Sequence, residues 1–140
     1  MKKALADALE ARGYDTLTPV QQAVLEPELD GVDMLVSAQT GSGKTLGFGL
    51  AIAPTLLRTA EHFPDAGAPL ALIIAPTREL AMQVKRELDW LYDKAGAVMA
   101  STVGGMDMRD ERRTLARGAH VVVATPGRLR DHIMRGSIDL

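Results

Sequence analysis

The chain has 140 residues, of which 46% are hydrophobic and 24% charged, and its formal net charge is −2. These values are typical of one globular domain with a proper core, and they argue against a globally basic nucleic-acid binder. The sequence contains no cysteine, which excludes disulfides and thiolate metal sites. No apolar run reaches the length of a membrane span, and the N-terminus has the pattern of a short amphipathic helix rather than of a signal peptide. We therefore expect a cytoplasmic protein without a membrane partner.

Charge is distributed unevenly along the chain. Residues 1–75 contain 5 Lys/Arg and 9 Asp/Glu, whereas residues 76–140 contain 11 and 9. A bound polyanion should therefore favour the later half through local contacts. Four arginines of that half are expected to form a solvated helix face instead: Arg109, Arg112, Arg113 and Arg117. The three histidines lack metal-ligand spacing and are expected to be surface or filler residues: His62, His120 and His132.

The first two predicted elements are helices. The first covers roughly residues 2–12 and ends at Gly13, which can adopt the left-handed conformation of a helix stop. The second begins with Thr18 as its N-cap and Pro19 in its first position, and it is expected to reach about Leu29.

A strand, a Gly-rich loop and a helix are then expected in direct succession. Residues 34–36 predict the strand, the loop AQTGSGKT occupies 38–45, and residues 46–57 predict the helix. This order forms an anion site, because loop N–H groups point inward and the helix dipole favours negative charge. Lys44 is expected to meet the β- and γ-phosphates and the Thr45 hydroxyl to bind Mg²⁺. The sequence therefore predicts a site for a nucleoside triphosphate.

The loop departs from the common P-loop pattern at one position. The spacing G-x-x-x-x-G-K-[ST] requires glycine at position 38, where this chain has Ala38. The first glycine is Gly41, and with Gly43 it permits positive φ angles and a close approach of the backbone to phosphate. Many P-loop kinases and GTPases carry the missing glycine, so the difference narrows the class of protein.

Strands and helices alternate through the rest of the chain. An uninterrupted apolar run at 70–75 predicts a strand buried on both faces. The remaining expected elements are a helix at 77–94 with an apolar stripe of Leu80, Val84, Leu88 and Leu91, strands at 97–102 and 119–124, and a helix at 126–135. Such alternation predicts an α/β fold with a parallel sheet and helices on both faces. Ligands of such sheets bind beyond the carboxyl ends of the strands, which selects the loops 37–45, 75–79, 102–106 and 124–128.

Five short elements appear in order along the chain: Gly13-Tyr14 with Thr18-Pro19-Val20-Gln21, then AQTGSGKT, Pro76-Thr77-Arg78-Glu79-Leu80-Ala81, Gly104-Gly105 and Thr125-Pro126-Gly127-Arg128. This set closely resembles the N-terminal RecA-like domain of DEAD-box ATP-dependent RNA helicases. The resemblance covers about 13–128 and implies a helicase ATP-binding, RecA-like P-loop domain within 1–140. The corresponding family elements are the Q motif at 13–21, motif I at 38–45, motif Ia at 76–81, GG at 104–105 and motif Ib at 125–128.

The resemblance implies how adenine is recognised. Gln21 would hydrogen-bond the adenine edge and Tyr14 would stack on the base. An amide offers both a donor and an acceptor, which match N6 and N7 of adenine, so ATP should be preferred over GTP. The implied nucleotide-binding residues are Tyr14, Gln21, Thr40, Gly41, Ser42, Gly43, Lys44 and Thr45. Among them Lys44 and Thr45 are the expected catalytic residues, and Thr45 is the expected Mg²⁺ ligand.

The later elements resemble the RNA-binding track of the family. The implied contacts are Pro76, Thr77, Arg78, Gly104, Gly105, Thr125, Pro126, Gly127 and Arg128. Arg78 and Arg128 can donate charge-assisted hydrogen bonds to phosphate oxygens, and such contacts ignore base identity. We therefore expect sequence-independent binding of single-stranded or duplex RNA. Glu79 is expected to orient an arginine.

Two parts of the family pattern do not occur in the sequence. The acidic Asp-Glu-Ala-Asp element and the second RecA-like domain are absent, so the domain is expected to be incomplete at the C-terminus. The chain is thus predicted to be an N-terminal piece of a helicase that binds ATP and RNA without turning ATP over by itself. Two alternatives remain: another P-loop NTPase such as a DNA helicase, and a catalytically inactive nucleotide- or RNA-binding scaffold.

Overall fold

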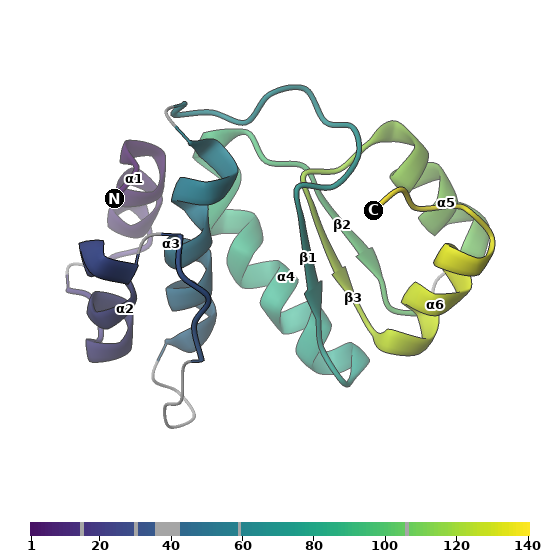
Figure 1. Cartoon of the computed structure of the whole chain (residues 1–140), viewed down its shortest axis with the longest axis horizontal. Helices are drawn as coiled ribbons and strands as arrows, with labels where there is room; N and C mark the ends of the chain where they lie inside the picture. The colour runs from purple at the N-terminus through teal and green to yellow at the C-terminus, as the bar shows by residue number, and fades with distance from the viewer. Residues whose placement is uncertain (15, 30, 36–42, 59, 106) are drawn as a thin grey trace.

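The computed structural model describes residues 1–14, 16–29, 31–35, 43–58, 60–105 and 107–140. A parallel sheet lies between α4 on one side and α5 and α6 on the other, and α1, α2 and α3 lie beyond α4 (Figure 1). The helices are α1 (Lys3–Ala11), α2 (Pro19–Val24), η1 (Pro27–Leu29), α3 (Lys44–Leu57), α4 (Arg78–Tyr92), η2 (Asp93–Ala95), α5 (Met108–Arg117) and α6 (Pro126–Met134). The strands are β1 (Ala71–Ile74), β2 (Met99–Thr102) and β3 (Val121–Ala124). The predicted α/β class, with a parallel sheet and helices on both faces, is confirmed.

The sheet has the strand order β1-β3-β2, and both of its strand pairs are parallel. Ile74 of β1 and Thr102 of β2 are both opposite Ala124 of β3. The carboxyl ends of the three strands therefore lie side by side, and this end of the sheet is called its carboxyl edge. The central strand β3 is buried throughout. Ile74 remains 56% exposed, because β1 pairs with a strand on one side only within the described residues. Burial on both faces, predicted for 70–75, is therefore wrong for β1.

Two apolar clusters cover the two faces of the sheet. The larger one joins α1, α3 and α4 to Val121 and Val123 of β3. The smaller one contains Val122, against which Leu115 of α5 and Ile138 pack from the other side. Alternate residues of β3 thus point into different clusters, as the period of two of a strand requires.

The buried stripe of α4 differs from the prediction by one residue. Val84, Leu88 and Leu91 are buried as expected. Leu80, however, is 42% exposed, and Ala81 is fully buried. The buried stripe is therefore Ala81, Val84, Leu88 and Leu91, which follow one another at helical spacing on one face of α4.

Helices α3 and α4 approach each other closely at Gly49. The Tyr92 hydroxyl donates a hydrogen bond of 2.5 Å to the Gly49 carbonyl. A Cβ atom at Gly49 would lie 2.6 Å from a methyl carbon of Leu91. Burial raises the pKa of the Tyr92 phenol, which keeps it a neutral donor. Glycine at this position therefore permits the packing of the two helices.

Two sequence predictions near the N-terminus are wrong. Helix α2 ends at Val24 rather than near Leu29, because Pro27 has no N–H group and disfavours helical conformation in the residue before it. Met34 and Leu35 lie outside any strand, and Leu35 is 99% exposed. No described strand pairs with them, and an apolar run forms a strand only with a hydrogen-bonded partner. Val36 lies outside the described residues.

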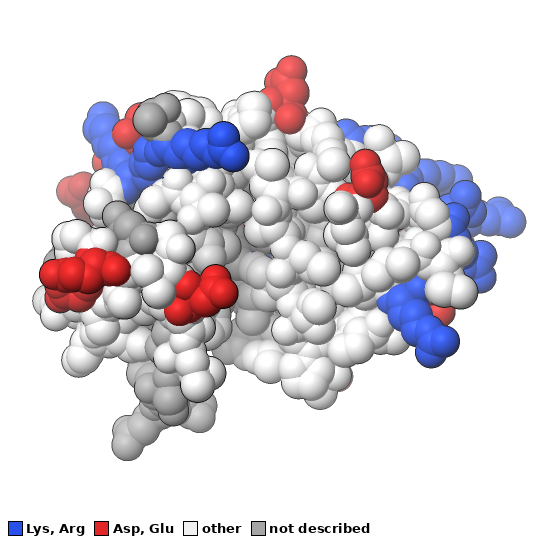
Figure 2. Space-filling model, in the orientation of Figure 1, with Lys and Arg blue, Asp and Glu red and all other residues white. Residues whose placement is uncertain are grey.

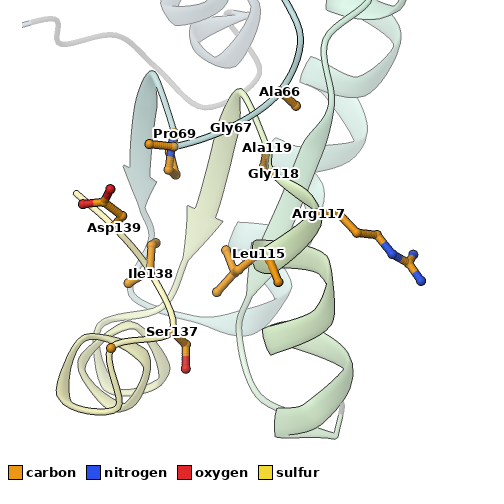
Figure 3. A pocket seen from close by; sticks show the side chains of 13 residues that line it. Ala66, Gly67, Pro69, Leu115, Arg117, Gly118, Ala119, Ser137, Ile138 and Asp139 are labelled. Carbon is orange, nitrogen blue, oxygen red and sulfur yellow. The ribbon is translucent and has the colours of Figure 1, made fainter.

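A cavity of about 350 Å³ lies at the opposite edge of the sheet, near the amino ends of β1 and β3. Pro69 precedes β1, Leu115 comes from α5, and Ile138 closes the cavity from the C-terminal segment (Figure 3). The predicted ligand loops that follow β1, β2 and β3 begin at the other end of the sheet, so this cavity is separate from their starting points. Among the helices of the described ranges, none combines the length and apolar character needed to cross a membrane.

Candidate functional site

The predicted elements Ia and GG meet at the carboxyl edge of the sheet. Thr77 caps α4 by accepting a hydrogen bond of 3.3 Å from the Leu80 amide, and this cap fixes the helix start at Arg78. Gly104 and Gly105 follow β2 with φ angles of +77° and +73°. A Cβ atom at Gly105 would clash with the Arg78 guanidinium, so the arginine lies directly over this glycine. The structure thus places one predicted RNA contact against another.

The predicted element Ib adjoins this pair through the central strand. The Thr125 amide donates to the Thr102 carbonyl at 3.1 Å, which connects the end of β3 to the end of β2. Helix α6 begins at Pro126, and Arg128 lies in its first turn. Arg128 donates from Nε to Oε1 of Glu111 at 2.7 Å. All three predicted elements of the RNA track therefore lie at one edge of the sheet.

Glu111 of α5 is the centre of a buried polar cluster. Its carboxylate accepts hydrogen bonds from the Val103 amide at 3.1 Å and from Arg128, and Nε2 of His132 lies 2.8 Å from Oε1. The side chains of Glu111 and His132 are completely buried. Because a carboxylate can only accept, Nε2 of His132 carries a proton. Nδ1 is buried and has no hydrogen-bond partner among the described residues, which favours the neutral Nε2–H tautomer.

This environment keeps Glu111 ionised. Burial acts to raise the pKa of its carboxyl group, but hydrogen bonds from His132, Arg128 and the Val103 amide, together with the Arg128 charge, hold that pKa below its ordinary value. An ionised carboxylate fixes the guanidinium of Arg128, the first turn of α6 and the chain before Gly104 relative to one another. The cluster therefore sets the geometry of the GG and Ib elements.

Sequence reasoning missed this cluster. Glu111, which pairs with Arg128, was not among the predicted site residues, and His132, expected to be a surface or filler residue, is completely buried beside it. His120 is also buried, and its Nδ1 accepts a hydrogen bond from the Val98 amide at 2.8 Å. A signal was present for Glu111, which precedes the inward-facing Leu115 by four residues and so lies on the same face of α5.

The polar face of α5 was predicted correctly. Its four arginines are exposed: Arg109, Arg112, Arg113 and Arg117. Basic side chains gather on the side of the molecule where α5 and α6 lie (Figure 2). The arginines of α5 and α6 therefore place part of the positive charge of the later half on this side.

The predicted phosphate end of the site is built from α2 and the start of α3. Gly43 precedes α3 with a φ angle of +84°, and Lys44 and Thr45 form the first turn. Gln21 is 1% exposed; its Oε1 accepts from the Thr18 amide at 3.0 Å, and its Nε2 donates to the Gly43 carbonyl at 3.2 Å. The Thr18 hydroxyl in turn accepts from the Gln21 amide and completes a capping box.

Gln21 therefore joins the start of α2 to the residue before Lys44. A side chain at position 43 would clash with the Gln21 amide, so this join also requires glycine. The other residues of the predicted phosphate loop, 38–42, lie outside the described residues, and they include the predicted contacts Thr40, Gly41 and Ser42.

Tyr14 lies on an aromatic neighbour that the sequence did not indicate. Its ring stacks on Trp90 of α4 with a centroid distance of 5.6 Å and an interplanar angle of 13°. Tyr14 remains 46% exposed. The adenine contacts of Tyr14 and Gln21 stay predictions.

The described residues contain no group of three or more His, Asp or Glu side chains arranged to hold a metal ion. Thr45, half-buried in the first turn of α3, stays the predicted Mg²⁺ ligand. Its hydroxyl is a hard oxygen donor of the kind that Mg²⁺ accepts beside phosphate oxygens. A single such ligand fits a metal bound together with a nucleotide rather than an all-protein cage.

In this chain a parallel sheet carries basic and glycine-containing loops at the carboxyl ends of its strands. This arrangement is typical of α/β proteins that bind their ligands beyond those strand ends. The sequence matches the family model "DEAD/DEAH box helicase" over residues 18–139. The chain belongs to this family, and the predicted resemblance is confirmed.

Curated relatives and solved structures agree with this assignment. The chain is 41% identical over 136 residues to "DEAD-box ATP-dependent RNA helicase 9" of Oryza sativa subsp. japonica, covering 97% of the chain and 21% of that protein. It is 41% identical over 129 residues to "ATP-dependent rRNA helicase RRP3" of Candida albicans, covering 92% of the chain and 23% of that protein. The chain thus spans between a fifth and a quarter of these relatives.

Among solved structures, yeast Prp28, described as a DEAD-box splicing factor, matches 99% of the chain and 34% of its own chain with a TM-score of 0.85 and 29% identity. The RNA helicase Prp28 from Chaetomium thermophilum, solved bound to ADP, matches 99% of the chain and 33% of its own with a TM-score of 0.83 and 39% identity. Both similarities support the fold as well as the family.

Proposed function

We propose that this chain supplies the ATP-binding site and part of the RNA-binding surface of an ATP-dependent RNA helicase. The proposal is carried by the convergence of the Arg78–Gly105 contact and the Glu111–Arg128 ion pair at the sheet edge to which the three strands point. The family is ATP-dependent, and the related Prp28 from Chaetomium thermophilum has been solved with ADP. We place RNA rather than DNA on the track because the relatives are named as RNA helicases.

The proposed nucleotide contacts follow from the start of α3. Lys44 lies at the N-terminal end of a helix, where its charge adds to the helix dipole and favours a phosphate. Thr45 would hold Mg²⁺, which neutralises charge on the phosphate oxygens when bound. Gln21, whose Oε1 and Nε2 bond Thr18 and Gly43 within the chain, would exchange these bonds for the adenine edge. These residues bind and orient ATP; they provide no base for the attacking water.

The proposed RNA contacts are directed at the sugar–phosphate backbone. Arg78 and Arg128 donate to phosphate oxygens, and Gly104 and Gly105 leave room for the strand to approach the main chain. Thr77 and Thr125 begin helices, so their neighbouring amides also favour anions. Such a track binds RNA without reading its sequence.

Binding measurements test both parts of this proposal. A fluorescent ADP analogue should bind the chain and be displaced by ATP more effectively than by GTP, and Lys44→Ala should abolish the binding. A single-stranded RNA oligonucleotide should bind with an affinity that falls as salt rises and that is the same for unrelated sequences. Equal competition by GTP would contradict the adenine assignment and favour another P-loop NTPase. A preference for DNA over RNA would favour a DNA helicase.

Turnover tests whether the chain is active by itself, and nucleotide binding separates the helicase proposal from the RNA-binding scaffold. We propose that the chain does not hydrolyse ATP in multiple turnovers, because in the sequence the apolar strands at 70–75 and 121–124 are followed by Pro76 and Thr125-Pro126 rather than by an acidic residue that could organise the metal and the attacking water. Multiple-turnover hydrolysis that Lys44→Ala removes would overturn this statement. Absence of nucleotide binding with RNA binding retained would favour an RNA-binding scaffold.

A further inference from the structure

Tyr14 is held against the half-buried ring of Trp90, which packs on the apolar core. Trp90 comes from α4 and packs on the larger apolar cluster while it stacks on Tyr14 at 5.6 Å. The guanidinium carbon of Arg12 lies 5.0 Å from the centroid of the Trp90 ring, within the range of a cation–π contact. The indole therefore connects the end of α1 to α4.

The backbone at Tyr14 leaves the direction of its ring to be set by the contact with Trp90. Helix α1 ends at Ala11, Gly13 has a φ angle of +80°, and the Tyr14 amide donates to the Leu9 carbonyl at 2.9 Å. Tyr14 thus lies just beyond a helix stop, where its own backbone does not fix the direction of the ring. The stack on Trp90 fixes it, and 46% of Tyr14 remains accessible to a ligand.

We propose that Trp90 is a positioning residue for adenine: its indole orients the Tyr14 ring before nucleotide binds. The proposal rests on the proposed function, in which Tyr14 stacks on the base. A ring that is already oriented loses less conformational entropy on binding, and this gain enters the affinity for the base but not for the phosphates. Trp90 therefore acts through Tyr14.

The experiment compares ATP with inorganic tripolyphosphate, which has no base. Trp90→Leu keeps an apolar side chain at this half-buried position but removes the aromatic ring, and Trp90→Phe keeps a ring. Met82→Leu, a change of another half-buried residue of α4, is the matched control. Trp90→Leu should weaken ATP binding about two- to tenfold, the size of one aromatic pair, and leave tripolyphosphate binding unchanged. Trp90→Phe should recover most of the ATP affinity, and Met82→Leu should change neither affinity.

A double-mutant cycle separates positioning from a general loss of packing. If Trp90 acts through Tyr14, the variant carrying both Tyr14→Leu and Trp90→Leu should bind ATP no more weakly than Tyr14→Leu alone. Additive losses, equal weakening for ATP and tripolyphosphate, or an unchanged or higher ATP affinity in Trp90→Leu would each overturn the proposal. If the unaltered chain binds tripolyphosphate but shows no additional affinity for ATP, the adenine site of the proposed function fails first.

A spectroscopic measurement tests the stack without nucleotide. The sequence contains one tryptophan, so the indole signals in fluorescence and near-ultraviolet circular dichroism arise from Trp90. Tyr14→Leu should change both signals while the far-ultraviolet spectrum stays the same. Unchanged indole signals in Tyr14→Leu would show that the two rings do not stack in solution and would overturn the proposal.

Discussion

Arg128, in the first turn of α6, donates from Nε to Oε1 of Glu111 at 2.7 Å, and the carboxylate of Glu111 is completely buried. The other carboxylate oxygen accepts the Val103 amide, so one side chain of α5 connects the chain before Gly104 to the proposed phosphate-binding arginine. The buried negative charge of Glu111 is tolerated because each hydrogen bond of its carboxylate comes from a donor group. The contact therefore links the GG and Ib elements of the proposed RNA track through one buried side chain.

Glu111→Gln tests the importance of the buried charge. The amide keeps the shape of the carboxylate but weakens the bond to Arg128 and must place an NH₂ group among donors. We expect the free energy of unfolding to fall by about 2–4 kcal/mol and RNA binding to weaken, with ATP binding unchanged. Asp110→Asn is the control, since Asp110 forms an exposed ion pair with Arg113 and should change stability by less than about 0.5 kcal/mol. Urea unfolding and RNA titration give both quantities; equal effects of the two variants would contradict the role of Glu111.

The same carboxylate predicts how stability depends on pH. The pKa of Glu111 is lower in the folded chain than its ordinary value of 4.5, so its contribution is complete above that value. The contribution should disappear as pH falls from there through the lower folded pKa, because the unfolded state then binds the proton more readily. The difference in free energy of unfolding between the unaltered chain and Glu111→Gln should therefore be constant near neutral pH and shrink in acid. A difference that grows on acidification would contradict the assigned direction.

Gly105→Ala tests the contact between the GG element and Arg78. Both Gly104 and Gly105 have positive φ angles, so alanine strains the backbone at either position. A methyl group at position 105 also displaces the Arg78 guanidinium, whereas nothing lies within 4 Å of a Cβ atom at position 104. We expect both variants to lose about 1 kcal/mol of stability and Gly105→Ala to bind RNA more weakly than Gly104→Ala. Equal RNA affinities would show that the position of Arg78 over Gly105 has no effect on binding.

Gly49 and Gly47 of α3 provide a matched pair for helix packing. A Cβ atom at Gly49 would lie 2.6 Å from Leu91 and 2.8 Å from Leu88, whereas at Gly47 its nearest contact is 3.9 Å, to Val24. Gly47→Ala should raise the free energy of unfolding by about 0.5–1 kcal/mol through helix propensity. Gly49→Ala should lower it by about 1–3 kcal/mol through overpacking between α3 and α4. Thermal or urea unfolding gives the sign, and stabilisation by both substitutions would contradict the close approach at Gly49.

Local sequence patterns predicted the parts of the fold that local physics controls. The Gly13 stop of α1, the Thr18 cap with Pro19, and the strand at Val121–Ala124 follow from backbone preference and from uninterrupted apolar character. The order of the loop elements was sufficient to predict the family, which the match over residues 18–139 confirms. Where a local signal was overlooked, as at Pro27, the predicted helix was too long.

Tertiary structure decided which side chains meet. Glu111 is 17 residues from Arg128 and 21 residues from His132 along the chain. The three side chains form one buried cluster because α5 and α6 cover the same face of the sheet. Tyr14 and Trp90 likewise meet because α1 packs against α4. Sequence by itself determined where the turns, caps and glycine-containing loops fall, since these depend on a few neighbouring residues. The strand order β1-β3-β2 brought those loops to one edge, and a buried charge or stacked ring acquires its partner only when distant elements pack together.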